Sequence, residues 1–203
     1  MNGYDFDKTI YRGDSTRDFF LYCLSRRPSL LRFLPMQGWQ ALRWRVFHRQ
    51  GKTAFKEQFY RFFTGITDMD TLLQSFWDSH IQNIKPWYLA QKKEDDLIIS
   101  ASPEFLLRPA MQRLGLKNLI ASRVDCRTGQ YTGKNCWGEE KVRRFHAELP
   151  GAEIENFYSD SLSDTPMARL AAAQCFIVAD DTLIPWAQYA ARHEKPNADY
   201  EEH

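Results

Sequence analysis

Three short apolar runs, each ending in polar residues, constrain the fold of this chain more than any other feature. The first run ends at Asp5, the run Leu97–Ile99 ends at Ser100, and the run that begins at Ile154 ends at Asp160. Short apolar runs that alternate with helical patterns are typical of buried parallel strands. Because the carboxyl ends of parallel strands meet at one edge of a sheet, we expect the three polar clusters to share one crevice.

The chain between the first and second runs has helical patterns and no strand pattern. Apolar residues recur at helical spacing from about residue 14 to residue 88, with breaks at Pro28 and near Gly65. After residue 89, strands and helices alternate, ending in a predicted helix 165–173 and a predicted strand 176–179. The sequence therefore predicts an α/β fold with a parallel sheet and helices on both faces. Its core comprises residues 1–13 and 89–203, and residues 14–88 form a helical insertion.

The composition excludes several classes of function. The chain has 203 residues, of which 43% are apolar and 26% charged, as expected of a globular domain, and its net charge of +1 gives no reason to expect a nucleic-acid partner. Its four cysteines form no C-x-x-C pair, so we expect reduced thiols and a cytoplasmic protein. No apolar stretch reaches the roughly 20 residues of a membrane helix.

A basic stretch without acidic residues runs from residue 26 to residue 52. It contains Arg26, Arg27, Arg32, Arg43, Arg45, Arg49 and Lys52. Aromatic and aliphatic residues recur between the arginines at helical spacing, which predicts an amphipathic helix. One interpretation is a helix that packs its aromatic face on its neighbours. The other is contact with a membrane surface or an anionic ligand, which would make the protein peripheral to a membrane.

The polar clusters contain the groups that phosphoryl transfer requires. Asp5 would be the nucleophile, and Asp7 would protonate the leaving group and then activate water. Asp5, Asp160 and the backbone carbonyl of Asp7 are a sufficient protein contribution to a Mg²⁺ site. Ser100 would bind phosphoryl oxygens, and Lys141 would supply a fixed positive charge.

Four motifs in this order resemble the phosphatases of the haloacid dehalogenase (HAD) superfamily, subfamily IB, which includes phosphoserine phosphatase. They are Asp5-Phe6-Asp7-Lys8-Thr9, Ser100 after its strand, Lys141, and Asp160-Ser161-Leu162-Ser163-Asp164. The resemblance spans residues 1 to about 185 and implies a Rossmann-like core. It also implies that residues 14–88 are a helical cap of the C1 type, which closes over the site and selects the substrate.

Three further residues are predicted to support this site. Thr9, Ser102 and Asp164 would bind the phosphate loop or orient the carboxylates. Ser102 and Asp164 also have a simpler interpretation as the N-caps of the helices that follow them.

The sequence leaves the substrate open between a small phosphorylated metabolite and a phospholipid head group. Asp14 resembles an acidic cap residue that faces the substrate amine in phosphoserine phosphatases, but the arginine that holds the carboxylate is replaced by Phe62, with Arg61 beside it. Ser100 to Pro103 resembles the branch that includes a bacterial phosphatidylglycerophosphate phosphatase. Phosphotransferase activity and a catalytically silent binding module are the remaining alternatives.

Overall fold

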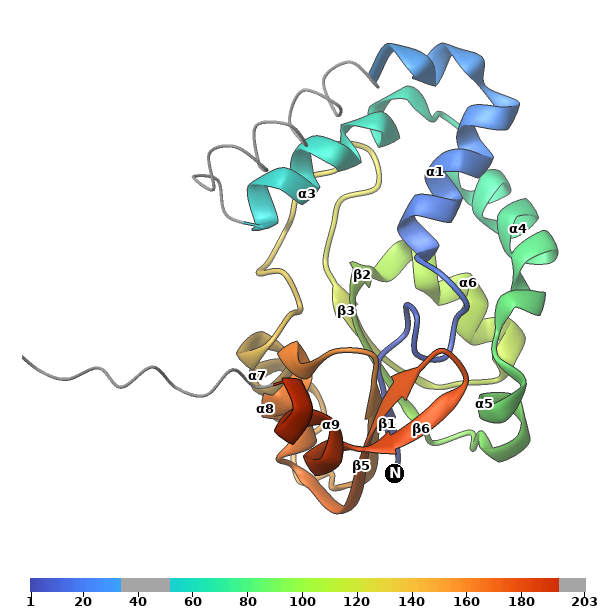
Figure 1. Ribbon diagram of the computed structural model, residues 1–203. Coiled ribbons are helices and arrows are strands. Elements are labelled where there is room, and N and C mark those ends of the chain that lie inside the picture. The colour runs from blue at the N-terminus through green and yellow to red at the C-terminus, as the bar shows by residue number, and fades with distance from the viewer. Residues whose placement is uncertain (34–51, 194–203) are drawn as a thin grey trace, which may run out of the picture.

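A computed structural model describes residues 1–33 and 52–193 of the chain. In these residues six strands form one sheet in the order β3-β2-β1-β4-β5-β6 (Figure 1). The strands are β1 (Gly3–Tyr4), β2 (Leu97–Pro103), β3 (Asn118–Ser122), β4 (Ile154–Ser159), β5 (Ala171–Ala179) and β6 (Thr182–Pro185). Strands β1 to β5 are parallel, and β6 runs antiparallel to β5 at the edge. The predicted parallel α/β sheet is confirmed.

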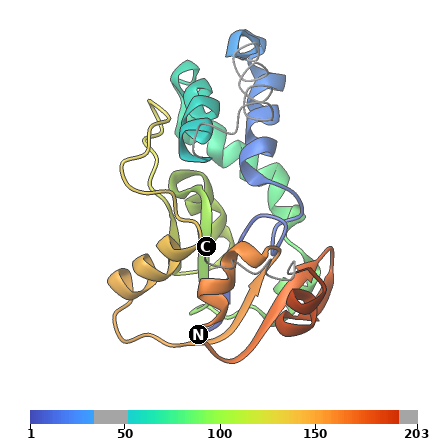
Figure 2. The ribbon, with the colours of Figure 1, turned by 60° about the vertical axis from the view of Figure 1, so that its left-hand side comes forward.

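Helices cover both faces of the sheet, as the alternation of side chains along the strands requires. The core helices are α5 (Pro86–Gln91), α6 (Glu104–Leu114), α7 (Glu139–Glu148), α8 (Thr165–Ala168), α9 (Trp186–His193) and the 3₁₀ turn η4 (Leu162–Asp164). Ile98 packs in the same apolar cluster as Leu106 of α6, whereas its neighbour Ile99 packs in the cluster that contains Phe145 of α7. Figures 1 and 2 show α5 and α6 on one side of the sheet and α7 and α8 on the other.

Apart from α5, the elements described between β1 and β2 are helices that stand beyond the carboxyl ends of the central strands (Figure 1). They are α1 (Ser15–Arg26), η1 (Pro28–Phe33), α3 (Lys52–Tyr60), η2 (Arg61–Gly65), α4 (Met69–His80) and η3 (Ile81–Asn83). We call residues 14–88 the cap. Their treatment as a separate unit from residues 1–13 and 89–203 stays a prediction.

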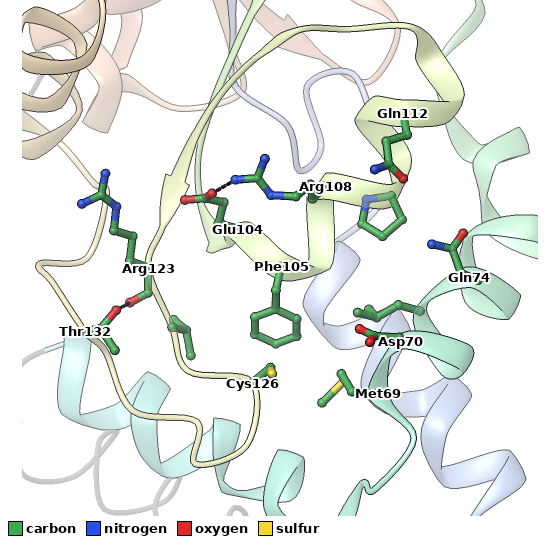
Figure 3. Close-up of a pocket in the computed structure, with 13 residues that line it drawn as sticks. Met69, Asp70, Gln74, Glu104, Phe105, Arg108, Gln112, Arg123, Cys126 and Thr132 are labelled. Atoms are coloured by element: carbon green, nitrogen blue, oxygen red, sulfur yellow. Dashed lines mark hydrogen bonds and ion pairs between the residues drawn. The ribbon is translucent and has the colours of Figure 1, made fainter.

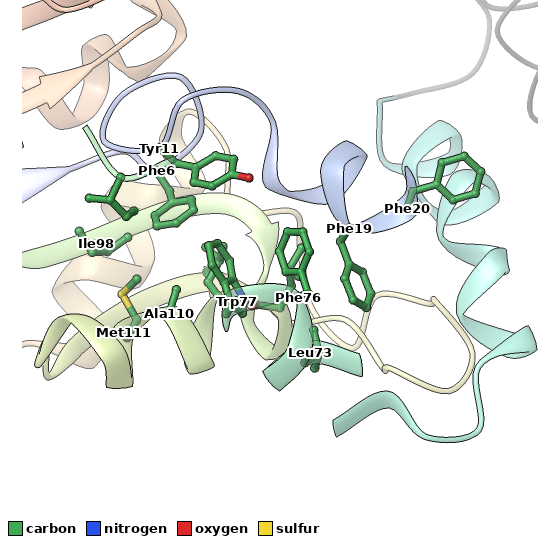
Figure 4. Packing of buried hydrophobic residues seen from close by; sticks show 14 of the residues in the cluster. Phe6, Tyr11, Phe19, Phe20, Leu73, Phe76, Trp77, Ile98, Ala110 and Met111 are labelled. Carbon is green, nitrogen blue, oxygen red and sulfur yellow. Dashed lines mark hydrogen bonds between the residues drawn. The ribbon is translucent and has the colours of Figure 1, made fainter. Parts of the chain in front are cut away.

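The cap shares one apolar cluster with the α6 face of the sheet. Trp77 of α4 is fully buried, and its indole N–H donates a hydrogen bond to the carbonyl of Leu106, at 2.7 Å. Its ring meets Phe6 of the core and Phe76 of the cap edge to face, and Figure 4 shows this row of aromatic rings. Helix α4 is therefore anchored to the core by continuous packing.

The end of the chain differs from the sequence-based prediction. The helix predicted over residues 165–173 stops at Ala168, and strand β5 begins at Ala171. The alanines there favour a helix, but pairing with β4 overrides that local preference. Asp180 then adopts a left-handed conformation with φ of 53°, which turns the chain into β6, a strand that the sequence analysis did not predict.

The basic stretch 26–52 lies mainly outside the described residues, so its predicted helix, with Arg43, Arg45 and Arg49, remains a prediction. Within residues 1–33 and 52–193, no helix combines the length and apolar character that crossing a membrane would need. All four cysteines are free thiols, as expected.

Candidate active site

The loop after β1 turns two carboxylates toward one cavity. The Asp5 N–H donates to the Tyr158 carbonyl at 2.9 Å, which extends the pairing of β1 with β4. Lys8 has a φ of 60°, and the chain reverses at this point. The Asp7 carboxylate accepts hydrogen bonds from the Ser15 N–H, at 2.6 Å, and from the Ser102 hydroxyl. Asp5 and Asp7 thereby line the same cavity.

Lys141, near the start of α7, bridges two buried carboxylates. Its ammonium lies 2.8 Å from Asp5 Oδ1 and 2.7 Å from Asp164 Oδ2. The Ser159 hydroxyl donates to the same Asp164 oxygen at 2.7 Å. Burial alone would lower the pKa of Lys141, but the charges of Asp5 and Asp164 outweigh it and raise that pKa above its usual value. Lys141 therefore stays a fixed cation beside Asp5.

Asp5 has more negative charge around it than Lys141 neutralises. Burial raises the pKa of Asp5 to about 7; Lys141 opposes this shift, while Asp164 and Asp160 add to it. Asp164 Oδ1 is buried and accepts no hydrogen bond within the described part of the chain. A bound cation would offset the repulsion between these carboxylates.

The atoms available to hold a metal at this site are of the type that Mg²⁺ prefers. Asp5, Asp160 and the Asp7 carbonyl offer only oxygen atoms, which Mg²⁺ prefers, and Mg²⁺ sites commonly use one or two carboxylates with waters and substrate phosphate. No group of three His, Cys, Asp or Glu side chains among the described residues is arranged to hold a metal.

Thr9 joins the first motif to the fourth. Its side chain is fully buried, and its hydroxyl oxygen accepts a hydrogen bond of 2.9 Å from the Asp160 N–H. Burial raises the pKa of Asp160, and the nearby charge of Lys8 partly offsets that rise. Thr9 thus positions the backbone that carries Asp160.

The side chains of Ser102 and Asp164, which the sequence analysis also interpreted as helix caps, make other contacts in the structure. Pro103, and not Ser102, occupies the N-cap position of α6, while Ser102 donates to Asp7 and its N–H donates to Ser100 Oγ at 3.1 Å. Asp164 occupies the N-cap position of α8, but its side chain pairs with Lys141 instead of capping the helix. The interpretation as side-chain caps is wrong for both.

Of the two cap residues that the sequence analysis predicted to contact the substrate, Asp14 lines the cavity and Arg61 does not. Asp14 caps α1 by accepting the Arg17 N–H at 2.9 Å and also lines the cavity. Arg61 is exposed and is not among the cavity-lining residues, and Phe62 is fully buried inside the cap. The role of Arg61 toward the substrate remains a prediction that this placement does not favour.

The cavity lies between the motif loops and the cap and has a volume of about 570 Å³. Its floor includes the predicted residues Asp5, Asp7, Ser100, Ser102, Lys141, Asp160 and Asp164. The cap and the loop after β3 add residues that the sequence analysis missed, namely Lys56, Phe59, Tyr60 and Trp137. Helical spacing could not single out these residues, because their position depends on how α3 packs against that loop.

Lys85 is a second residue that the sequence analysis missed. Only 3% exposed, it donates to the Lys8 carbonyl at 2.6 Å and to the Asp180 carbonyl. The lysine therefore holds the turn that follows Asp7 against the β5–β6 turn.

A different cavity of about 460 Å³ lies between α4, α6 and the loop after β3 (Figure 3). Phe105, Met69 and Cys126 point into it, and an Arg108–Glu104 ion pair lies at its edge. None of the predicted site residues line it.

Comparison with known proteins identifies the family of the chain. The sequence model of the haloacid dehalogenase-like hydrolases matches residues 3–169. A protein named histidinol-phosphatase from Neisseria meningitidis serogroup C is 28% identical over 102 residues, which are 44% of this chain and 46% of that protein. A protein from Mycobacterium tuberculosis named as a probable phosphatase is 35% identical over 80 residues, 36% of this chain and 28% of that protein. The aligned segments thus span less than half of these relatives.

A similar fold occurs in a solved structure. A protein of unknown function from Bordetella pertussis Tohama I superimposes with a TM-score of 0.70 over 95% of this chain and 94% of the other. The two sequences are 21% identical, so the likeness concerns the fold alone.

Proposed function

The chain belongs to the haloacid dehalogenase-like hydrolase family, and we propose that it is a magnesium-dependent phosphomonoester hydrolase that works through an aspartyl phosphate. The observation that carries the proposal is the bridge from Lys141 to Asp5 and Asp164 on the floor of a cavity that Asp7 and Asp160 also line. A buried lysine between two carboxylates keeps a nucleophile charged and oriented where phosphate negative charge must also be held.

In the first step, a carboxylate oxygen of Asp5 attacks phosphorus, and the bond from phosphorus to the leaving-group oxygen breaks. Asp7 donates its proton to that oxygen. In the second step, Asp7 takes a proton from water, the water oxygen attacks the phosphorus of the aspartyl phosphate, and Asp5 is regenerated with release of inorganic phosphate. The hydrogen bonds from the Ser15 N–H and the Ser102 hydroxyl orient Asp7 for both transfers.

Mg²⁺ would be held by Asp5, Asp160 and the backbone carbonyl of Asp7, and when bound it offsets the negative charge of the phosphoryl group. Ser100, only 1% exposed and lining the cavity, would donate to a phosphoryl oxygen. Asp164 acts through Lys141, which it holds in place.

Hydrolysis of a generic aryl phosphate tests this proposal. We expect activity in wild type with Mg²⁺, loss of activity with a chelator, and loss in Asp5→Asn whose fold is verified by circular dichroism. If wild type and Asp5→Asn are equally inactive with every divalent metal and at every pH tried, the chain is a silent binding module on this fold.

Small metabolites are the substrate class that the cavity supports best. Asp14 offers a carboxylate to an amine, and aromatic residues such as Phe59 and Trp137 offer walls to the leaving group. The test panel should therefore include phosphoserine, histidinol phosphate and simple alkyl phosphates. Alcohol acceptors added to the same assays would reveal phosphotransferase activity.

A phospholipid head group is the second candidate, supported by the basic stretch 26–52. If it is correct, vesicles of anionic lipid will bind the protein, and binding will fall with salt and with substitution of Arg43, Arg45 and Arg49. Binding that is absent or insensitive to salt would remove the lipid candidate.

A further inference from the structure

The cap places a lysine in the active-site cavity that the catalytic scheme does not use. Lys56, on α3, lines the cavity together with Asp5, Asp7 and Lys141. Its ammonium donates to the carbonyl of Ala101 at 3.0 Å and to Asn135 Oδ1 at 3.4 Å. One side chain of the cap thus contacts both the C-terminal part of β2 and the loop after β3.

The partners of Lys56 differ in charge from those of Lys141. Lys141 is paired with two carboxylates within 2.8 Å, whereas both hydrogen bonds of Lys56 go to uncharged oxygens. Burial lowers the pKa of Lys56, and more distant carboxylates oppose that shift. Within the described residues this partly buried ammonium has no direct anionic partner. Such an arrangement is costly, and an anion from the substrate would offset that cost.

The position of Lys56 points to the leaving-group side of the cavity. The carbonyl that Lys56 contacts belongs to Ala101, next to Ser102, and the Ser102 hydroxyl donates to Asp7. Asp14 lines the same cavity. Asp7 is the proposed acid for the leaving group, and Asp14 belongs to the cap. The phosphoryl group must lie in line with Asp5, where Lys141 already supplies positive charge.

We propose that Lys56 binds a second anionic group, carried on the leaving group of the substrate. The inference rests on the proposed phosphatase function and narrows the substrate class to phosphomonoesters with a carboxylate or a second phosphate a few bonds from the scissile one. Lys56 is then a specificity-determining residue.

The experiment compares substrate pairs that differ only in the second anion. Phosphoserine against phosphoethanolamine tests a carboxylate, and glycerophosphoglycerophosphate against glycerol 3-phosphate tests a phosphodiester. For each pair the ratio of kcat/KM values is measured in wild type, Lys56→Met, Lys56→Arg and Lys117→Met. Lys117 is an exposed lysine paired with Glu94 and serves as the matched control.

We expect wild type to prefer the substrate with the extra anion in at least one pair. The ratio for that pair should fall about 10- to 100-fold in Lys56→Met, the range of a lost charge-assisted hydrogen bond, and recover in part in Lys56→Arg. Lys117→Met should keep the wild-type ratio.

Two results would overturn the inference. One is an equal loss of kcat/KM on both members of every pair in Lys56→Met, which would make Lys56 a contact of the scissile phosphate or a strut between cap and core. The other is a wild type that hydrolyses these esters without preference for the second anion. Failure of the proposed function itself is distinct, because wild type would then hydrolyse none of them.

Discussion

The two regions that meet at the cavity satisfy their charges in different ways. In the motif loops of the core, charged groups contact one another directly, since Lys141 pairs with Asp5 and with Asp164. The cap contributes a cation, Lys56, whose direct contacts are uncharged, together with aromatic rings. In the proposed function, this difference would let the core hold its reacting groups in place, while the cap keeps a cation available for a ligand.

The largest expected effect comes from breaking the pairing within the core. Lys141→Met would leave two buried carboxylates without their cation. We expect kcat/KM on an aryl phosphate to fall about 10³-fold or more, and the free energy of unfolding to fall by about 3 kcal/mol. Steady-state kinetics and urea unfolding check the two numbers. A variant that keeps full activity would show that Lys141 is only a structural ion.

A second test concerns the anchor between the cap and the core. Trp77→Ala removes a fully buried ring from the shared cluster and the hydrogen bond to Leu106, so the free energy of unfolding should fall by about 3–5 kcal/mol. Trp137→Ala is the control, because Trp137 is 41% exposed, and its cost should be about 1 kcal/mol or less. Equal costs would mean that α4 is not packed on α6 in solution.

The contact between the loop after β3 and the cap can be tested with two glycines. Gly129 and Gly115 have φ values of 75° and 68°, so alanine is strained at both, but only at Gly129 would the new Cβ collide with the Tyr60 carbonyl. Gly129→Ala should therefore lower the free energy of unfolding by about 1–2 kcal/mol more than Gly115→Ala. Equal destabilisation in urea unfolding would remove this contact.

The smallest expected effect concerns Lys85, which holds the turn after Asp7. Lys85→Met should leave the carbonyls of Lys8 and Asp180 without their donor and lower the free energy of unfolding by about 1 kcal/mol or somewhat more. Chemical denaturation measures the change, with Lys117→Met as the exposed control. An unchanged midpoint would show that the β5–β6 turn does not support the catalytic loop.

The core could be predicted from sequence because its signals are local. Asp5 and Asp160 directly follow β1 and β4, and Ser100 follows the apolar run Leu97–Ile99 within β2. Each position could therefore be predicted from a few neighbouring residues. The parallel sheet followed from the alternation of strands and helices. The antiparallel strand β6 did not, since it depends on the left-handed turn at Asp180 and on pairing with residues 176–179.

The cap's part of the site depends on contacts that no local pattern shows. Lys56 and Arg61 are five residues apart and equally basic, yet only Lys56 lines the cavity. Their different placement results from the packing of α3 on the loop after β3. There, Glu57 accepts a hydrogen bond of 3.1 Å from the Tyr131 N–H. A single sequence carries no periodic signal for such a contact between distant segments.

The most direct test of the central claim is to trap the phosphoryl group on Asp5. Wild type and Asp5→Asn would be mixed with a ³²P-labelled aryl phosphate and Mg²⁺, quenched in acid within a turnover, and digested for peptide mapping. The account predicts transient label on the wild-type peptide that contains Asp5 and none in Asp5→Asn. Hydrolysis that proceeds with label on another residue, or at the same rate in Asp5→Asn, would contradict it.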